Sequence, residues 1–148
     1  MLNLNTGAVK IPIQRDGEAA GSICFNPNEL DFAERFYSLL AEFEEKEKEY
    51  KNALAKLDEN NEIDSYGLPK NAAQRLALLR DIAEYMKGRI DYVFGAGTSA
   101  VLFGEAIVLE IFEQFFEGVT PYIEQARVGK IEKYVDAKKP TKTKKVMK

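Results

Sequence analysis

Two stretches of the chain repeat apolar residues at alternating steps of three and four positions. The first stretch begins near Asn28, a residue type that caps helices, and the second begins near Asn71. Alternating steps of three and four are the spacing of a heptad interface, which places the apolar side chains on one face of a helix. The first seam comprises Ala33, Phe36, Leu40, Phe43, Glu47, Tyr50, Leu54 and Leu57. The second seam comprises Ala72, Leu76, Leu79, Ala83, Met86, Ile90 and Val93.

The segment DENNEIDSYGLPK between the two stretches is rich in residues that form turns. Two long helices joined by a short connection pack side by side, so the pattern predicts an antiparallel helical hairpin. Glu47 is the only seam position without an apolar side chain. It pairs with Arg80 or Lys87 of the facing helix, marks where the seam loosens, or lies in solvent at the edge of the seam. We favour the solvent position.

The first 25 residues have the two-residue period of β-strands. LNLN and AVKIPIQ alternate apolar and polar side chains, and Asp16 and Gly17 supply the chemistry of a tight turn. Pro12 lacks a backbone donor and therefore favours an edge strand. We expect a small β-hairpin or a three-stranded meander over residues 1–25.

A third helix is predicted over residues 99–117, where apolar side chains lie on nearly every face. Thr120 and Pro121 then carry the signals of a helix start, because threonine caps helices and proline fits the first helical position. We therefore expect a last helix at about 121–135. The predicted fold class is mainly α: a helical bundle with a long antiparallel hairpin and a small N-terminal β-hairpin or meander.

The most aromatic part of the chain is the segment IFEQFFEGV within the third predicted helix. One interpretation is that these large side chains pack in the core of the protein. The other is that two helices and a small sheet leave part of this aromatic surface uncovered, so that it contacts another chain. Both interpretations stay open from the sequence. The candidate partner-binding residues are Phe103, Phe112, Phe115, Phe116 and Tyr122.

The composition removes several classes of chemistry. The chain of 148 residues contains no histidine and a single cysteine, Cys24. Ser-His-Asp and Cys-His catalysis and a Cys/His metal site within one chain are therefore excluded. We expect no catalytic residues, no cofactor and no metal. Because neither an apolar run of about eighteen residues nor a signal sequence is present, we expect a soluble protein inside a cell.

The charge is distributed unevenly. The last twelve residues, AKKPTKTKKVMK, hold six lysines and no acid, so residues 1–136 carry 15 basic and 24 acidic side chains, a net charge of −9. The tail has no aromatic residue for base stacking, and the acidic body repels nucleic acid, so we expect no specific nucleic-acid partner. The predicted organisation is one helical domain over 1–136, with β structure in 1–25 and helices in 28–135, and a basic disordered tail over 137–148.

The glycine-rich stretch FGAGTSA, residues 94–100, has two interpretations. A phosphate-binding loop needs a lysine directly after its last glycine, whereas Thr98 follows Gly97 here. The alternative is a connection between helices, in which Gly95 ends one helix in a left-handed conformation and Thr98 or Ser99 caps the next. We favour the connection, and an enzyme that uses this loop is the weaker alternative.

Three stretches together resemble a known family: ICFNPNELDFAERFYSL, EFEEKEKEY and DYVFGAGTSAVLFGEAIVLEIFEQFFEGVTPYI. They are similar to tail assembly chaperones of long-tailed bacteriophages and of prophages in Gram-positive hosts. The resemblance covers about residues 20–125, and its most specific part is the FG-x-GTS stretch followed by FEQFFEG.

The resemblance implies a small helical protein without enzymatic activity that acts in the cytoplasm of the bacterial host. Such proteins coat the long tape measure protein, help tail tube protein subunits to polymerise around it, and are absent from the mature virion. It also implies a possible homo-oligomer, and a longer form made by ribosomal frameshifting if the Lys138-Lys139 or Lys144-Lys145 codons form adenine runs. The alternative is a coiled-coil adaptor or regulator of a phage or mobile element.

Overall fold

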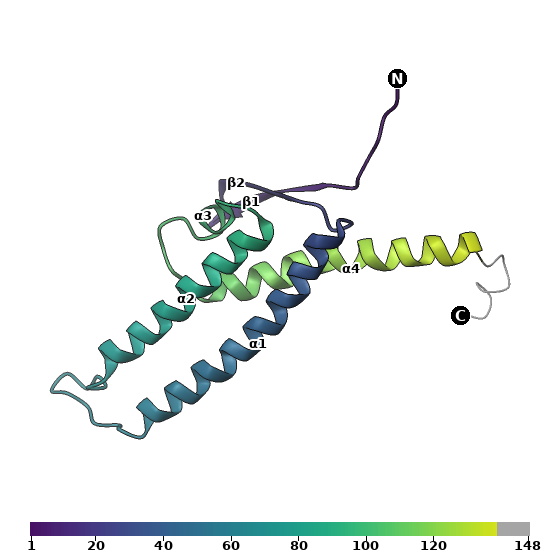
Figure 1. Cartoon of the computed structure of the whole chain (residues 1–148). Coiled ribbons are helices and arrows are strands. Elements are labelled where there is room, and N and C mark those ends of the chain that lie inside the picture. Colours follow the sequence, from purple (N-terminus) through teal and green to yellow (C-terminus); the bar gives the residue numbers. More distant parts are fainter. Residues whose placement is uncertain (139–148) are drawn as a thin grey trace.

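The computed structural model describes the backbone of residues 1–138 and the side chains of residues 1–126. Within this range an antiparallel β-hairpin is followed by four helices (Figure 1). The elements are β1 Val9–Arg15, β2 Glu18–Phe25, α1 Leu30–Asp58, α2 Ala72–Phe94, α3 Thr98–Phe103 and α4 Glu110–Lys138. The predicted fold class is therefore confirmed, with a hairpin of two strands at the N-terminal end. The predicted disordered tail began at residue 137, but α4 runs to Lys138, so that start is wrong. The rest of the predicted tail, 139–148, lies outside the described residues.

The β-hairpin turns at Asp16 and Gly17, which both have positive φ, 55° and 82°. Two successive residues in this conformation match the twist of paired strands, so the Asp-Gly pair sets the turn. β1 and β2 pair antiparallel with Ile11 opposite Ile23, and a bulge follows Ile13. Because the strands alternate, their isoleucines lie on the side that packs against the helices.

α1 and α2 form the predicted antiparallel hairpin, and its loop end projects away from the rest of the molecule (Figure 1). Near the β-hairpin the seam is buried, as at Phe36 and Ile90. Toward the loop its side chains are half-buried, and Leu76 is 65% exposed. Two helices alone leave their shared seam open on both sides, so this half of the hairpin lacks a full core.

Glu47 is exposed, and its Oε1 lies 2.9 Å from the Nζ of Lys51 on the same helix. The predicted solvent position is therefore confirmed. Among the described side chains two ion pairs do cross the hairpin, Asp58 with Arg75 near the loop and Glu42 with Arg89 nearer the core. In the second pair Arg89 Nε and Nη2 donate to the carboxylate at 2.7 and 3.0 Å. The hydrogen bonds from Arg89 to Glu42 hold the pKa of Arg89 above its usual range.

Replacing Arg89 with methionine is expected to lower the free energy of unfolding by about 1 kcal/mol. The bidentate contact is lost, but the loss is limited because the two side chains are 30% and 33% exposed and water screens the pair. Urea denaturation of the wild type and the variant measures the difference. Adding Glu42→Gln to the Arg89→Met variant should lower the free energy of unfolding only slightly further, because the partner charge is already gone. A second decrease as large as the first would contradict the pairing.

Three details of the predicted helices are wrong. The side chain that caps α1 is Glu29 rather than Asn28, accepting hydrogen bonds from the backbone N–H groups of Asp31 and Phe32. The predicted helix over 99–117 is two helices, because the chain breaks between Phe103 and Glu110. The predicted start at Pro121 is absent, because α4 runs through that proline.

The helix α4 continues through Pro121 because its opposite face is held in the core. Phe115, Val119 and Ile123 follow one another at steps of four and are all buried. Proline removes the donor that would pair with the carbonyl of Glu117, but Glu117 and Pro121 are exposed, so water can hydrogen-bond that carbonyl. Thr120, the expected cap, donates its hydroxyl to the carbonyl of Phe116 at 2.6 Å.

The core sits where the β-hairpin, the helical hairpin and α4 meet. Its buried side chains come from β2 and all four helices and form one cluster. Phe94, the last residue of α2, is at the centre of its aromatic part: its ring lies 5.0–5.4 Å from the rings of Phe25, Phe32 and Phe115, and 6.1 Å from that of Phe36.

Candidate functional site

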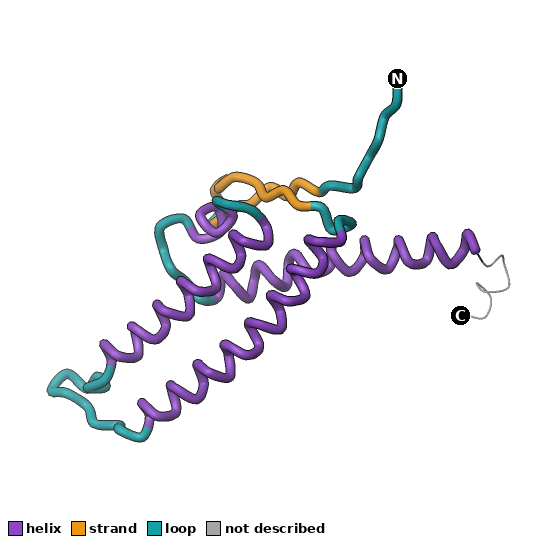
Figure 2. The backbone as a smooth tube through the Cα atoms, viewed as in Figure 1, coloured by secondary structure: helices purple, strands orange, loops and turns teal. Residues whose placement is uncertain are grey.

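The break between α3 and α4 decides how α4 lies against the rest of the molecule. Gly104 ends α3 with φ 62° and ψ −131°, and the loop to Glu110 lets α4 cross the helical hairpin (Figures 1 and 2). A Cβ at Gly104 would lie 2.7 Å from the guanidinium of Arg15, which donates to the carbonyl of Val101. The β-hairpin thus packs against this turn, and only glycine fits there.

Gly104→Ala is expected to destabilise the protein by about 2 kcal/mol, because alanine is strained at this φ and displaces Arg15. Gly118→Ala in the middle of α4 is the matched control: a Cβ there has no atom within 4 Å, and φ is not positive. The same substitution should then stabilise α4 by about 0.5–1 kcal/mol. Thermal and urea unfolding of both variants test this, and a shift of the same sign in both would refute the assignment of Gly104.

Crossing of α4 over the hairpin creates a first concavity, here named the hairpin groove. It has a volume of about 600 Å³ and lies between α1, α2 and the first turns of α4. Phe43 and Phe116 meet edge-to-face across it, with ring centroids 5.1 Å apart. Its apolar residues are Leu40, Phe43, Tyr50, Ile82, Met86, Leu109, Phe112 and Phe116, and its charged residues are Glu44, Lys46, Glu47 and Glu113.

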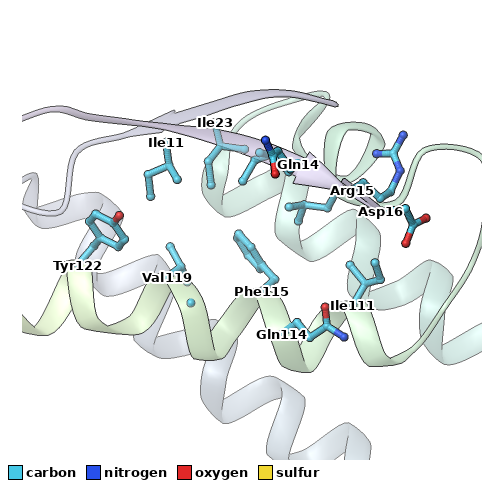
Figure 3. A pocket seen from close by; sticks show the side chains of 13 residues that line it. Ile11, Gln14, Arg15, Asp16, Ile23, Ile111, Gln114, Phe115, Val119 and Tyr122 are labelled. Carbon is cyan, nitrogen blue, oxygen red and sulfur yellow. The ribbon is translucent and has the colours of Figure 1, made fainter. Parts of the chain in front are cut away.

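A second concavity of about 320 Å³, here named the strand cleft, separates the β-hairpin from α4. Figure 3 shows Phe115 and Val119 rising from α4 toward Ile11 and Ile23 of the strands. Polar side chains flank this apolar interior at both ends, including Arg15 and Tyr122. The cleft is smaller than the hairpin groove and receives side chains from two elements that already share the core.

The predicted partner-binding residues divide between the core and these two concavities. Phe103, Phe112 and Phe115 are buried within the single chain, so core packing accounts for most of their surface. Phe112 also contributes to the lining of the hairpin groove, and Phe115 to that of the strand cleft. Phe116 is half-buried in the hairpin groove. Tyr122 is 45% exposed at the strand cleft. The predicted residues therefore form no single aromatic patch.

Sequence reasoning missed the residues of α1 and α2 that line the groove, such as Phe43 and Met86. Both are seam positions, and the seam was expected to be covered by the facing helix. A signal was present nonetheless: a seam broken at Glu47 marks where two helices no longer enclose their apolar face.

The glycine loop directs its donors toward a carboxylate of the protein itself. The backbone N–H of Ser99 and its hydroxyl donate to the two oxygens of Asp91 at 2.7 and 2.8 Å. Thr98 donates its hydroxyl to the carbonyl of Gly95 at 2.8 Å. Both glycines have positive φ, but the left-handed residue is Gly97 rather than the predicted Gly95. The side chain that accepts a hydrogen bond from the first turn of α3 belongs to Asp91, not to the predicted Thr98 or Ser99. A bound phosphate would face the Asp91 charge.

Residues 22–148 match a protein family that is described as a family of unknown function (DUF6673). The chain belongs to this family. The matched range contains every residue of the hairpin groove, whereas β1, one wall of the strand cleft, precedes it. No curated protein and no solved structure matches the chain.

The part of the chain that the structure describes lacks two further classes of site. It holds no group of three or more histidine, cysteine, aspartate or glutamate side chains placed to bind a metal ion. It also contains no helix that is both long and apolar enough to span a membrane. Within this DUF6673 member, the hairpin groove is therefore the feature from which a function is best argued.

Proposed function

We propose that this protein is a phage tail assembly chaperone that binds the helices of a tape measure protein in its hairpin groove. In this proposal it acts in the host cytoplasm without catalysis and is absent from the mature virion. The observation that carries the proposal is a large apolar groove walled by three helices, on a chain whose sequence resembles these chaperones. A tail tube protein is the second partner to be tested.

An amphipathic helix suits the shape and chemistry of the groove. Such a helix inserts apolar side chains at intervals of three and four residues into a hydrophobic groove. Each large apolar side chain that is fully buried contributes about 1.5–3 kcal/mol, so a few of them offset the association cost, which is about 4–15 kcal/mol. Phe43, Met86 and Phe116 are all half-buried and can supply the receiving surface.

The geometry of the glycine loop makes an enzyme that binds a nucleotide there a weaker proposal than the chaperone. Its Ser99 donors already bind Asp91, and Thr98 and Ser99 are buried. A nucleotide phosphate would have to displace a carboxylate and open a packed turn. Calorimetry with ATP and GTP tests this directly, and binding that is lost in a Gly97→Val variant would revive the alternative.

The adaptor alternative has one observation in its favour, at the tip of the helical hairpin. The loop there is ordered around Asp64, whose carboxylate accepts the N–H groups of Tyr66 and Leu68 at 2.8 and 3.0 Å. It nevertheless holds large apolar side chains in solvent, with Tyr66 87% exposed. An ordered loop that exposes apolar groups is typical of a contact surface. A complex that depends on Tyr66 rather than on the groove would favour the adaptor.

Co-expression with a tape measure protein, which we expect to be encoded beside this gene, tests the proposed function. We expect the long protein to be insoluble alone and to co-purify with this chain when both are made together. The genes immediately downstream should include a tape measure protein. If the neighbouring protein stays insoluble and no complex forms, the chaperone proposal is wrong.

A further inference from the structure

The charged residues around the hairpin groove are mostly acidic. Glu44 and Glu47 line it from α1, and Glu113 lines it from α4. Lys46 is the one basic residue in its lining. The acids thus lie on both the α1 and the α4 walls of an apolar floor, where they flank anything that enters between them.

Their charges are only partly neutralised within the described side chains. Glu47 pairs with Lys51 at 2.9 Å. Lys46 is turned aside, with its Nζ 3.5 Å from Glu49 and 4.5 Å from the centre of the Tyr85 ring. Among residues 1–126, neither Glu44 nor Glu113 makes an ion pair. The groove lining therefore holds more acidic than basic side chains, and two of its carboxylates have no ion-pair partner among residues 1–126.

The α4 wall carries further acidic side chains. Between Gly104 and Ala126 the sequence carries five acidic residues and no lysine or arginine. Glu110, Glu113 and Glu117 recur at steps of three and four, so they follow one side of α4, and all three are exposed. A helix lying along this wall would meet carboxylates over successive turns.

We propose that the occupant of the hairpin groove is an amphipathic helix whose apolar stripe is flanked by lysine or arginine side chains. This inference rests on the proposed function, because it names the chemistry of the partner at the same groove. The lysine or arginine side chains of such a helix can form ion pairs with the carboxylates of Glu44 and Glu113. Its apolar stripe packs against the apolar floor of the groove. A helix with acidic flanks meets the same floor but is repelled at both walls.

Charge also argues against the acidic body of a second copy, residues 1–136, as the occupant. Residues 1–136 have a net charge of −9, and the exposed face of α1 and the start of α4 share that sign. Docking the helical body of one copy into the groove of another would bring like charges together. A foreign basic helix has no such cost.

The probes are two synthetic helical peptides with the same leucine and phenylalanine stripe, one flanked by lysine and one by glutamate. We expect the full chain to bind the lysine peptide at least about tenfold more tightly, as measured by fluorescence anisotropy. Raising the ionic strength from about 0.05 M to about 0.5 M should reduce this preference, because salt screens exposed charges. Equal binding of the two peptides at low salt would overturn the inference.

The decisive variant is the double reversal Glu44→Lys and Glu113→Lys. We expect it to lose about tenfold in affinity for the lysine peptide and to gain affinity for the glutamate peptide. The matched control is Glu34→Lys with Glu124→Lys, which changes net charge equally at exposed positions outside the groove. Circular dichroism checks that both variants stay folded. An equal loss in the control would mean that only net charge matters and would overturn the site.

Two further outcomes separate this inference from the proposed function. If the lysine peptide binds as expected but no neighbouring tape measure protein co-purifies, the groove chemistry stands and the chaperone proposal falls. If the tape measure protein co-purifies with the double reversal as well as with the wild type, the chaperone proposal stands and the inference falls. Self-association in analytical ultracentrifugation that is lost in the double reversal would assign the groove to a second copy instead.

Discussion

Replacing Phe94 with alanine is expected to lower the free energy of unfolding by about 3–5 kcal/mol. The ring is buried and lies within 5.0–6.1 Å of four other phenylalanine rings. Its removal leaves a cavity where β2, α1, α2 and α4 meet, because the surrounding rings cannot all move inward. Chemical denaturation followed by circular dichroism measures the loss.

Two comparisons make this prediction specific. Phe94→Leu keeps most of the volume and should cost about 1–2 kcal/mol less than alanine at the same position. Leu76→Ala on the same helix removes a side chain that is 65% exposed and should change stability by less than about 0.5 kcal/mol. If Phe94→Ala were as mild as Leu76→Ala, the aromatic cluster would not be the core of the fold.

The parts of the fold that follow from local pattern were predictable. The two heptad seams predicted α1 and α2 and their antiparallel packing, because short-range periodicity alone determines which face is apolar. The Asp16-Gly17 pair likewise predicted the β-hairpin turn, since few other pairs adopt two positive φ angles in succession. In each case the determining residues are neighbours in sequence.

The break after α3 was not predictable in this way. Residues 99–117 are apolar on nearly every face of the predicted helix. Such a segment has no alternation of apolar and polar faces from which the end of one helix and the start of the next could be located. Gly104 within such a run is compatible with both a helix and a turn. The turn is stabilised by Arg15, which lies 89 positions earlier in the chain and donates to Val101. Only a tertiary contact decides between the two.

The location of the hairpin groove was not predictable from the sequence. An apolar surface for another helix was expected, but it was assigned to the aromatic residues around Phe112 and Phe115, which are buried. Exposure depends on which elements cross, and the groove exists because α4 crosses the helical hairpin at Phe43 and Phe116. That an apolar surface binds a partner helix stays a prediction, and the location of the groove depends on the packing of three helices.

Met86→Lys is expected to abolish most partner binding, lowering affinity by at least about thirtyfold. Met86 lies on α2 in the apolar lining of the hairpin groove and is half-buried. A lysine at this position removes apolar contact area and places a cation against a basic partner helix. The fold should tolerate the substitution, because lysine is a good helix former and its long side chain can extend its charge toward Glu44 or Glu47. The measurement is retention of the tape measure protein, or of the lysine-flanked peptide, on immobilised variant.

The control for this prediction is Leu76→Lys, which makes the same kind of change on the same helix at an exposed position outside the groove. It should bind as the wild type does. Equal loss in both variants would move the contact to the loop end of the helical hairpin, where Leu76 lies near the exposed tip, and would support the adaptor alternative. Unchanged binding in both would show that neither face of α2 carries the interaction. Because Met86→Lys alters affinity with little expected change in unfolding free energy, it separates the groove's role in binding from its role in the core.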